Sequence, residues 1–184
     1  REIISMPPKF FPATPKWGNY KQAFEMAPFA RFFFNSLLVT VLGVFLQTFL
    51  TILMAFTFSR LSFPGRDLIF TLLLGLMMVP YEMLIITNYA TISSLNLLDT
   101  YLAIFLPSSA SVYYTFILRN NFLAIPDSLY YSARLDGASN WQYLWRIMVK
   151  LAQPAIVTIV LLNAIGLWNT FLWPLIVTNQ EAMR

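Results

Sequence analysis

Long apolar stretches alternate with short polar ones along this chain. No charged residue occurs over 32–59, a stretch longer than the roughly 20 residues that a helix needs to cross the hydrocarbon of a bilayer. Three further apolar stretches follow, so the pattern predicts spans over about 32–58, 68–90, 101–118 and 155–177. The Pro-rich start predicts an extended segment and then a short helix near 20–26. The expected fold is all-α: a polytopic helical membrane protein with four spans.

The polar connections between these spans predict an orientation. Residues 59–67 contain two basic residues and a Pro-Gly pair that predicts a tight turn, whereas 91–100 contain no Lys or Arg. Residues 119–154, called the large loop below, contain four basic residues. Because short loops rich in basic residues stay in the cytoplasm, the large loop is predicted to be cytoplasmic and both ends of the chain to lie outside.

Composition agrees with the membrane class. Of the 184 residues 58% are apolar and only 11% are charged, and the net charge of +4 comes from basic residues dispersed at span ends. That dispersion does not indicate a nucleic-acid surface. The chain has neither Cys nor His, which excludes disulfides, thiolate chemistry and the commonest metal ligand. Residues 1–184 are therefore expected to form one transmembrane domain in a lipid bilayer, with no metal site.

The large loop carries the signals of two short helices. Asp127 is expected to cap the first, and Gly137 to end it, since Gly takes the left-handed conformation without steric cost. Ser139, with Gln142 three residues later, has the pattern of a capping box that starts the second helix. These helix-start and helix-end signals indicate a loop with a defined shape.

The second helix is predicted to have one continuous apolar face, because Trp141, Leu144, Trp145 and Met148 fall at i, i+3, i+4 and i+7. Two surroundings would cover such a face. One is the inner leaflet, on which the helix would lie with its basic residues towards the headgroups. The other is a groove on a partner protein.

The large loop resembles the cytoplasmic signature of ATP-binding-cassette importer permeases, which reads EAA, three residues, G, nine residues, I-x-L-P. Aligned on Gly137, Ala133 and Ile147 match the signature, and the string ARLDGASNWQYLWRI is similar to the carbohydrate-uptake branch. The strings FFNSLLVT, AFTFSRLSFPGRD, NLLDTYLAIFLP and WNTFLWPLIV look like the same branch. Two positions depart from the signature: Tyr131 stands for its Glu and Lys150 for its Pro. A loop of this composition is expected to bind its partner mainly through apolar contacts.

The resemblance implies a permease subunit of the maltose or glycerol-phosphate type, in the bacterial inner membrane. Its expected partners are an ATPase dimer, a second permease subunit and an extracellular or periplasmic solute-binding protein. ATP and Mg would be bound by the ATPase, and this chain would be neither an enzyme nor a cofactor protein. Its glycines accordingly form no phosphate-binding loop. The residues implied in coupling to the ATPase are Ala133, Asp136, Gly137, Ala138, Trp141, Leu144, Trp145 and Ile147.

Most members of this branch have six spans, so the four predicted here imply a fragment with one span missing at each end. The chain also begins at Arg1 without an initiator Met. The substrate implied by the resemblance is a sugar or a related polyol.

Polar residues inside the predicted spans are the candidates for the solute path, because they are costly in hydrocarbon. Glu82 either lines the path or reaches the outer interface by snorkelling. Asn163 and Thr170, seven residues apart, are expected to share a helical face that lines the path or packs on another helix. Asn35 and Gln47 are more simply helix-helix contacts. The alternative function, an ion-coupled secondary transporter, would rest on Glu82 as its intramembrane acid.

Overall fold

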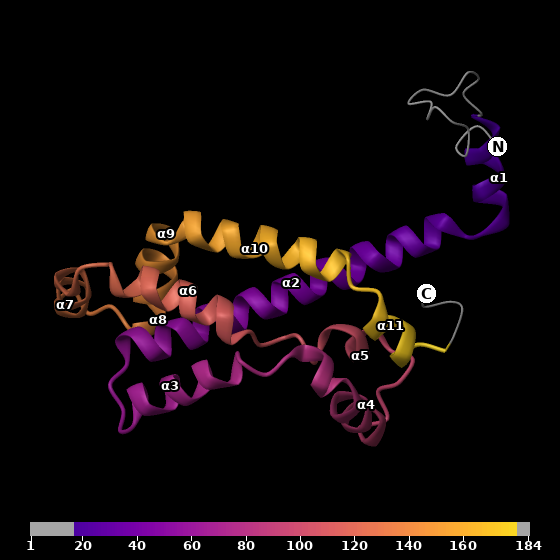
Figure 1. Cartoon of the computed structure of the whole chain (residues 1–184). Coiled ribbons are helices and arrows are strands. Elements are labelled where there is room, and N and C mark those ends of the chain that lie inside the picture. Colours follow the sequence, from indigo (N-terminus) through magenta and orange to yellow (C-terminus); the bar gives the residue numbers. More distant parts are fainter. Residues whose placement is uncertain (1–16, 180–184) are drawn as a thin grey trace, which may run out of the picture.

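The computed structural model describes residues 17–179, and all regular structure within this range is helical (Figure 1). The chain starts with α1 (Gly18–Met26), turns, and enters the long helix α2 (Phe29–Arg60). It continues through α3 (Arg66–Leu76), the 3-10 turn η2 (Tyr81–Leu84), α4 (Ile85–Ser94), α5 (Tyr101–Phe105), α6 (Val112–Leu123), α7 (Asp127–Leu135), α8 (Asn140–Tyr143), the π-helical turn η3 (Leu144–Met148), α9 (Val149–Leu151), α10 (Gln153–Trp168) and α11 (Leu172–Val177).

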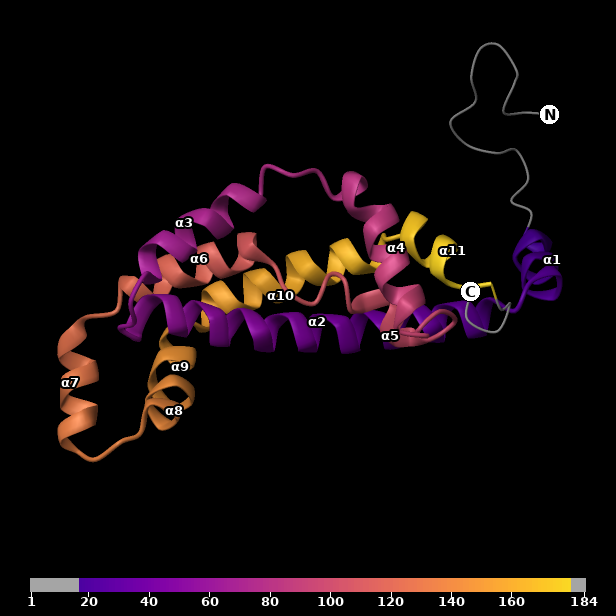
Figure 2. The same cartoon turned by 90° about the horizontal axis from the view of Figure 1, so that it is seen from below.

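The fold is built around α2, and α6 and α10 pack along it (Figures 1 and 2). By length and composition, α2 is the one described helix that could cross a membrane alone. Two bent pairs would qualify if each were one crossing: α3 with η2 and α4, bent by 93°, and α8 to α9 with α10, bent by 80°. The predicted all-helical class is thus confirmed, with one to three candidate spans.

The helices are more broken than the apolar pattern predicts. α3 ends at Leu76, and Pro80 lies in the break that follows. Proline favours such a break because it lacks an N–H and disfavours helix in the residue before it. The stretch 101–118 falls on α5 and α6, which are separated by 106–111. Ser111 caps α6 by accepting a hydrogen bond from the Tyr114 N–H at 3.3 Å. α6 continues beyond the predicted span end at 118, through Arg119 to Leu123.

Two apolar clusters hold the helices together. One lies at the end of α2 that meets the large loop, where side chains from α2, α6, α8, η3 and α10 are buried together. The other joins α2 to α4, α5 and α11. Between them Gly43 gives α5 and α10 close access to α2, since a Cβ at this position would lie 2.8 Å from Leu167 Cδ1 and 3.1 Å from Phe105 Cβ. A side chain here would push the helices apart.

The large loop is a folded unit at one end of this bundle. α7 and α8 stand out from the bundle near the C-terminal end of α2, far from α1 (Figure 2). The predicted helix at 20–26 matches α1.

Candidate functional site

α7 ends in a left-handed turn at Gly137, as predicted. The φ angle of Gly137 is 78°. Its N–H donates to the Arg134 carbonyl at 3.1 Å, and the Ala138 N–H donates to the Ala133 carbonyl at 2.9 Å. These two bonds form a Schellman motif, which satisfies carbonyls that the helix end leaves without partners. A Cβ at Gly137 would meet nothing within 4 Å, so the requirement for glycine comes from the backbone conformation alone.

The start of α8 is also as predicted. The Ser139 hydroxyl accepts from the Gln142 N–H at 3.2 Å, and the Ser139 N–H donates to the Gln142 side chain at 2.8 Å. This reciprocal pair is the capping box. The Schellman motif and the capping box lie next to each other and fix the angle between α7 and α8.

The prediction that Asp127 caps α7 is wrong. Pro126 occupies the cap position, and no side-chain hydrogen bond is made there. Asp127 is instead the first helical residue, and its carboxylate pairs with the guanidinium of Arg60 at the end of α2. The ion pair holds the carboxylate away from the α7 backbone, so the carboxylate does not make the N-cap hydrogen bond.

Arg60 joins three elements at this point. Its guanidinium donates to the carbonyl of Phe122 at 2.8 Å and to that of Ile125 at 2.5 Å, besides pairing with Asp127. The side chain is only 5% exposed. Arg60 therefore ties the end of α2 to the junction between α6 and α7. The Phe122 carbonyl belongs to the last turn of α6 and the Ile125 carbonyl follows it, so both bonds are made to acceptors at a helix end.

Arg119 ties the same region to α3. Its Nε donates to the Phe58 carbonyl at 3.0 Å, and its guanidinium lies 4.3 Å from the centre of the Phe70 ring. It also contacts the Asp67 carboxylate at 3.4 Å. Arg60 and Arg119 together connect α2, α3, α6 and α7.

The predicted apolar face of the second helix is not continuous. Leu144 is 1% exposed and Met148 is fully buried in the chain's own core, whereas Trp141 is largely exposed. Trp145 is half-buried, with its ring stacked 6.0 Å from that of Phe49 in α2. Trp141 still contacts Trp145, with ring centroids 5.5 Å apart, but it stands in the first turn of α8, where the rest of the chain covers it less.

Tyr143 attaches α8 to α7. Its ring is buried and lies 5.0 Å from that of Tyr130 in α7. The hydroxyl of Tyr130 donates to the Asn140 side chain at 3.0 Å. Burial raises the pKa of the Tyr143 phenol above its ordinary value, so this group stays neutral in the large loop.

Large apolar side chains are exposed on the large loop, among charged and polar ones. Leu135 is 89% exposed, and Tyr131 one turn earlier on α7 and Trp141 on α8 are also exposed. We call these three residues the outer face. The sequence analysis did not single out Leu135, although its i, i+4 spacing from Tyr131 places the two on one side of α7. Of the other predicted coupling residues, Asp136 and Gly137 are exposed, Ala138 and Ile147 are half-buried, and Ala133 is buried.

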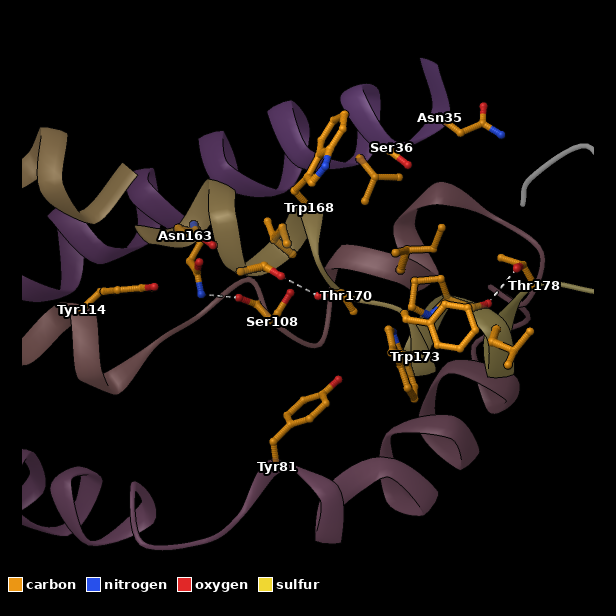
Figure 3. A pocket seen from close by; sticks show the side chains of 18 residues that line it. Asn35, Ser36, Tyr81, Ser108, Tyr114, Asn163, Trp168, Thr170, Trp173 and Thr178 are labelled. Atoms are coloured by element: carbon orange, nitrogen blue, oxygen red, sulfur yellow. Dashed lines mark hydrogen bonds between the residues drawn. The ribbon is translucent and has the colours of Figure 1, made fainter. Parts of the chain in front are cut away.

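A cavity of about 780 Å³ lies beside α2, α10, α11 and the connection from α5 to α6 (Figure 3). Asn163 and Thr170 both line it, but Glu82 does not and is exposed in η2. The shared helical face predicted for Asn163 and Thr170 is wrong, because α10 ends at Trp168. The turn that follows brings Thr170 to the cavity, with its hydroxyl bonded to the Gly166 carbonyl at 2.9 Å.

Two buried amides give this cavity its polar character. Gln47 is 6% exposed; its Nε2 donates to the Ser108 carbonyl at 2.6 Å, while its Oε1 has no partner in the described part of the chain. Asn163 is 5% exposed, and its Nδ2 likewise has no partner there. A buried polar group left unpaired costs about 1–3 kcal/mol. Gln47 therefore binds the connection between α5 and α6 and not, as predicted, another helix, and it also lines the cavity.

No metal centre is present within residues 17–179: the structure brings no three His, Cys, Asp or Glu side chains into a ligand group there. The charged clusters at the base of the large loop are formed by the contacts of Arg60 and Arg119. The two candidate functional features in the described part of the chain are therefore the outer face and the cavity.

The chain is similar to known transport proteins along most of its length. It is 36% identical to Protein LplC of Bacillus subtilis (strain 168), with 94% of this chain and 58% of that protein covered. It is 33% identical to the arabinooligosaccharides transport system permease protein AraQ of the same organism, with 94% and 62% covered. The sn-glycerol-3-phosphate transport system permease protein UgpE of Yersinia enterocolitica is 29% identical, with 99% and 67% covered.

A solved structure has the same fold. It is the crystal structure of a bacterial ABC transporter involved in the import of the acidic polysaccharide alginate, with a TM-score of 0.75 and 30% identity. The match covers 81% of this chain and 52% of that one. The chain thus spans only part of each of these proteins, 58% and 62% in the two Bacillus relatives.

A family model described as "binding-protein-dependent transport system inner membrane component" matches residues 47–184. The match includes the large loop and all the strings on which the resemblance was drawn except FFNSLLVT, which precedes it at 33–40. It confirms that resemblance, and agrees with the predictions of a multi-pass bacterial inner-membrane permease that is not itself the ATPase and holds no cofactor of its own. Because the match extends over more than half of its length, the chain belongs to the family of binding-protein-dependent transport system inner membrane components.

Proposed function

We propose that this chain is part of a permease subunit that imports a sugar-type solute and couples transport to ATP hydrolysis by a separate ATPase. The names of similar proteins support a solute of this class, since they refer to arabinooligosaccharides, sn-glycerol 3-phosphate and alginate. The observation that carries the proposal is the geometry of the large loop: two helices held at a fixed angle by a Schellman motif and a capping box, with apolar side chains exposed on the outside.

The outer face is the part that docks on the ATPase. Tyr131, Leu135 and Trp141 present apolar surface that nothing in the described chain covers. Burying one such side chain against a partner is worth about 1.5–3 kcal/mol. Leu144 and Trp145 act behind this surface: they pack on the core and on α2 and transmit movement of α8 to the spans.

ATP and Mg are bound by the ATPase dimer, and closure of that dimer moves α7 and α8. A second permease subunit completes the path, and a solute-binding protein delivers the solute. In the proposed arrangement the described helices make four crossings, although α2 is the one described helix that could cross alone. In this arrangement α5 and α6 together make the third crossing, although a break at 106–111 separates them.

The test is Leu135→Glu in the intact transporter. A charge at the centre of the outer face should weaken docking, so less ATPase should co-purify with the permease and ATP-dependent uptake should fall at least several-fold. The matched control is Leu95→Glu, since Leu95 is also exposed but lies in the connection after α4. Normal uptake and normal ATPase content in the Leu135 variant would overturn the docking role.

A further inference from the structure

We propose that α1 is an interfacial helix, which lies along the outer surface of the bilayer with Trp17, Tyr20 and Phe24 in the headgroup region. The assignment to the outer side rests on the proposed function, because α1 lies at the end of α2 opposite the large loop (Figure 2). The position at a bilayer surface rests on α1 and α2 alone.

The connection to α2 places α1 at a bilayer surface. The 32 residues of α2 extend about 48 Å at about 1.5 Å per residue. The hydrocarbon core of a bilayer is only about 30 Å thick, so a crossing by α2 carries its ends into the polar regions on both sides. Arg31, the third residue of α2, marks the polar end on the α1 side. Since only Ala27 and Pro28 separate α1 from α2, α1 lies close to that surface.

The turn between α1 and α2 directs α1 away from the axis of the span. The φ and ψ angles of Pro28 are −75° and 62°, and the Phe29 N–H donates to the Ala27 carbonyl at 2.8 Å. These values define an inverse γ-turn. Pro28 stabilises the turn, because its ring restricts φ and disfavours helix in the residue before it. α1 therefore leaves the end of α2 sideways (Figures 1 and 2), as a helix on a membrane surface must.

α1 has an aromatic side and a charged side. Trp17, directly before the helix, and Tyr20 and Phe24 within it fall at i, i+3 and i+7, so they share one side. All three are between 66% and 74% exposed. Elsewhere on the helix, the exposed Lys21 and Glu25 pair at 4.0 Å. Such a division is typical of helices that lie in a membrane interface.

The aromatic side of α1 is continuous with exposed rings at the start of α2. The Phe24 ring lies 5.6 Å from that of Phe29, which lies 6.3 Å from that of Phe32. Phe29, Phe33 and Phe34 are between 44% and 61% exposed. Aromatic side chains at the end of a span favour the boundary between lipid and water, so the aromatic side of α1 extends the same belt.

A lipid surface fits this side of α1 better than a groove on a protein. Three aromatic side chains bury at most about 450–750 Å², whereas each partner in a stable protein interface contributes about 800 Å². Tyr and Trp also combine an apolar body with a polar tip, which suits a layer that is apolar on one side and wet on the other. Because the charges of Lys21 and Glu25 cancel, the attraction does not depend on anionic lipid.

Spin labels measure the depth of α1 directly, because this chain has no Cys of its own. Phe24→Cys is labelled with a nitroxide in the intact transporter, whose other subunits are made free of reactive Cys, in phosphatidylcholine bilayers. The matched control is Gln22→Cys, since Gln22 is also exposed but lies on the opposite side of α1. The Phe24→Cys label should collide several-fold more often with O₂, which concentrates in lipid, than with a water-soluble nickel chelate. The control should show the reverse preference.

Three results would overturn the inference. Frequent collisions of both labels with the nickel chelate would place α1 in water. Protection of the Phe24→Cys label from both O₂ and nickel would show a protein partner, and protection that requires added solute-binding protein would identify that partner. A preference for O₂ that appears only when phosphatidylglycerol is added would replace the aromatic basis by an electrostatic one.

Sidedness and uptake separate this inference from the proposed function. A membrane-impermeant thiol reagent should modify Gln22→Cys from the outside of intact cells. Modification from the cytoplasmic side alone would overturn the outer assignment, and with it the orientation of the large loop. If the transporter imports its solute with ATP while both labels report water, this inference fails and the proposed function stands.

Discussion

Gly137 shows how much a single backbone conformation contributes at the residue scale. Its φ of 78° allows the Schellman motif, and its surroundings would leave room for a side chain. Ser139 then opens the next helix two residues later. The shape of the turn therefore depends on conformational preference and on local hydrogen bonds, with no contribution from packing at Gly137.

Gly137→Ala is expected to lower the stability of the loop by about 1–2 kcal/mol, the cost of a left-handed conformation for a residue with a Cβ. The melting temperature of the purified transporter and its uptake per ATP hydrolysed should both fall. Gly137→Asp should be worse, because it adds a charge near the docking surface. The control is Gly75→Ala in α3, where a Cβ also meets nothing within 4 Å and φ is not positive. That change should be neutral or stabilising, by about 0.5–1 kcal/mol. Equal effects of the two alanines would contradict the account.

At the scale of elements, the attachment of the large loop to the spans is polar as well as apolar. The outer face is exposed, whereas the inner side of α8 and η3 is buried in the cluster shared with α2, α6 and α10. Arg60 adds hydrogen bonds to two backbone carbonyls at the junction of α6 and α7. Movement of the loop must therefore move α2 and α6 with it.

Arg60→Gln is expected to destabilise the junction by about 1–3 kcal/mol, because it removes the Arg60 donor from the part-buried Ile125 carbonyl and one of the donors from the Phe122 carbonyl, which also accepts from the Ile125 N–H. The Asp127→Asn change should cost less than about 1 kcal/mol, since this carboxylate is mostly exposed to solvent. Thermal unfolding measures stability, and the ratio of solute imported to ATP hydrolysed measures coupling. The Arg60 variant should lower that ratio, and Arg60→Lys should restore part of it.

The control for Arg60 is Lys21→Gln in α1, which removes an exposed i, i+4 ion pair with Glu25. Its effect should be within about 0.5 kcal/mol. A loss of stability in the Arg60 variant with an unchanged coupling ratio would show that Arg60 has a structural role only.

At the scale of the whole molecule, the sequence was informative wherever the physics is local. The Gly137 turn and the capping box involve residues within a few positions of one another, so their patterns could be read directly. The pairing of Arg60 with Asp127 joins positions 67 residues apart, and no local pattern reports it. The same limit applies to Gln47, whose bond to Ser108 spans 61 residues.

Helix continuity was the other limit. Apolar composition indicates that a segment lies in a membrane but not that it forms one unbroken helix. The breaks near Pro80 and at 106–111 leave backbone groups that side chains and neighbouring helices satisfy, such as the Ser111 cap and the Gln47 amide at the Ser108 carbonyl. The π-helical turn η3 is a further departure from a uniform helix. Sequence periodicity assumes a uniform helix and could not predict either feature.

The central claim is that the outer face of the large loop docks on an ATPase. The most direct measurement is cross-linking from Leu135→Cys in the intact transporter, with Leu95→Cys as the reference, because this chain has no other Cys. A short reagent with one thiol-reactive and one photoreactive end should join Leu135→Cys, and not Leu95→Cys, to the ATPase subunit, with a yield that changes when ATP is added. Equal yields from the two positions, or cross-links from Leu135→Cys to lipid or permease alone, would contradict the account.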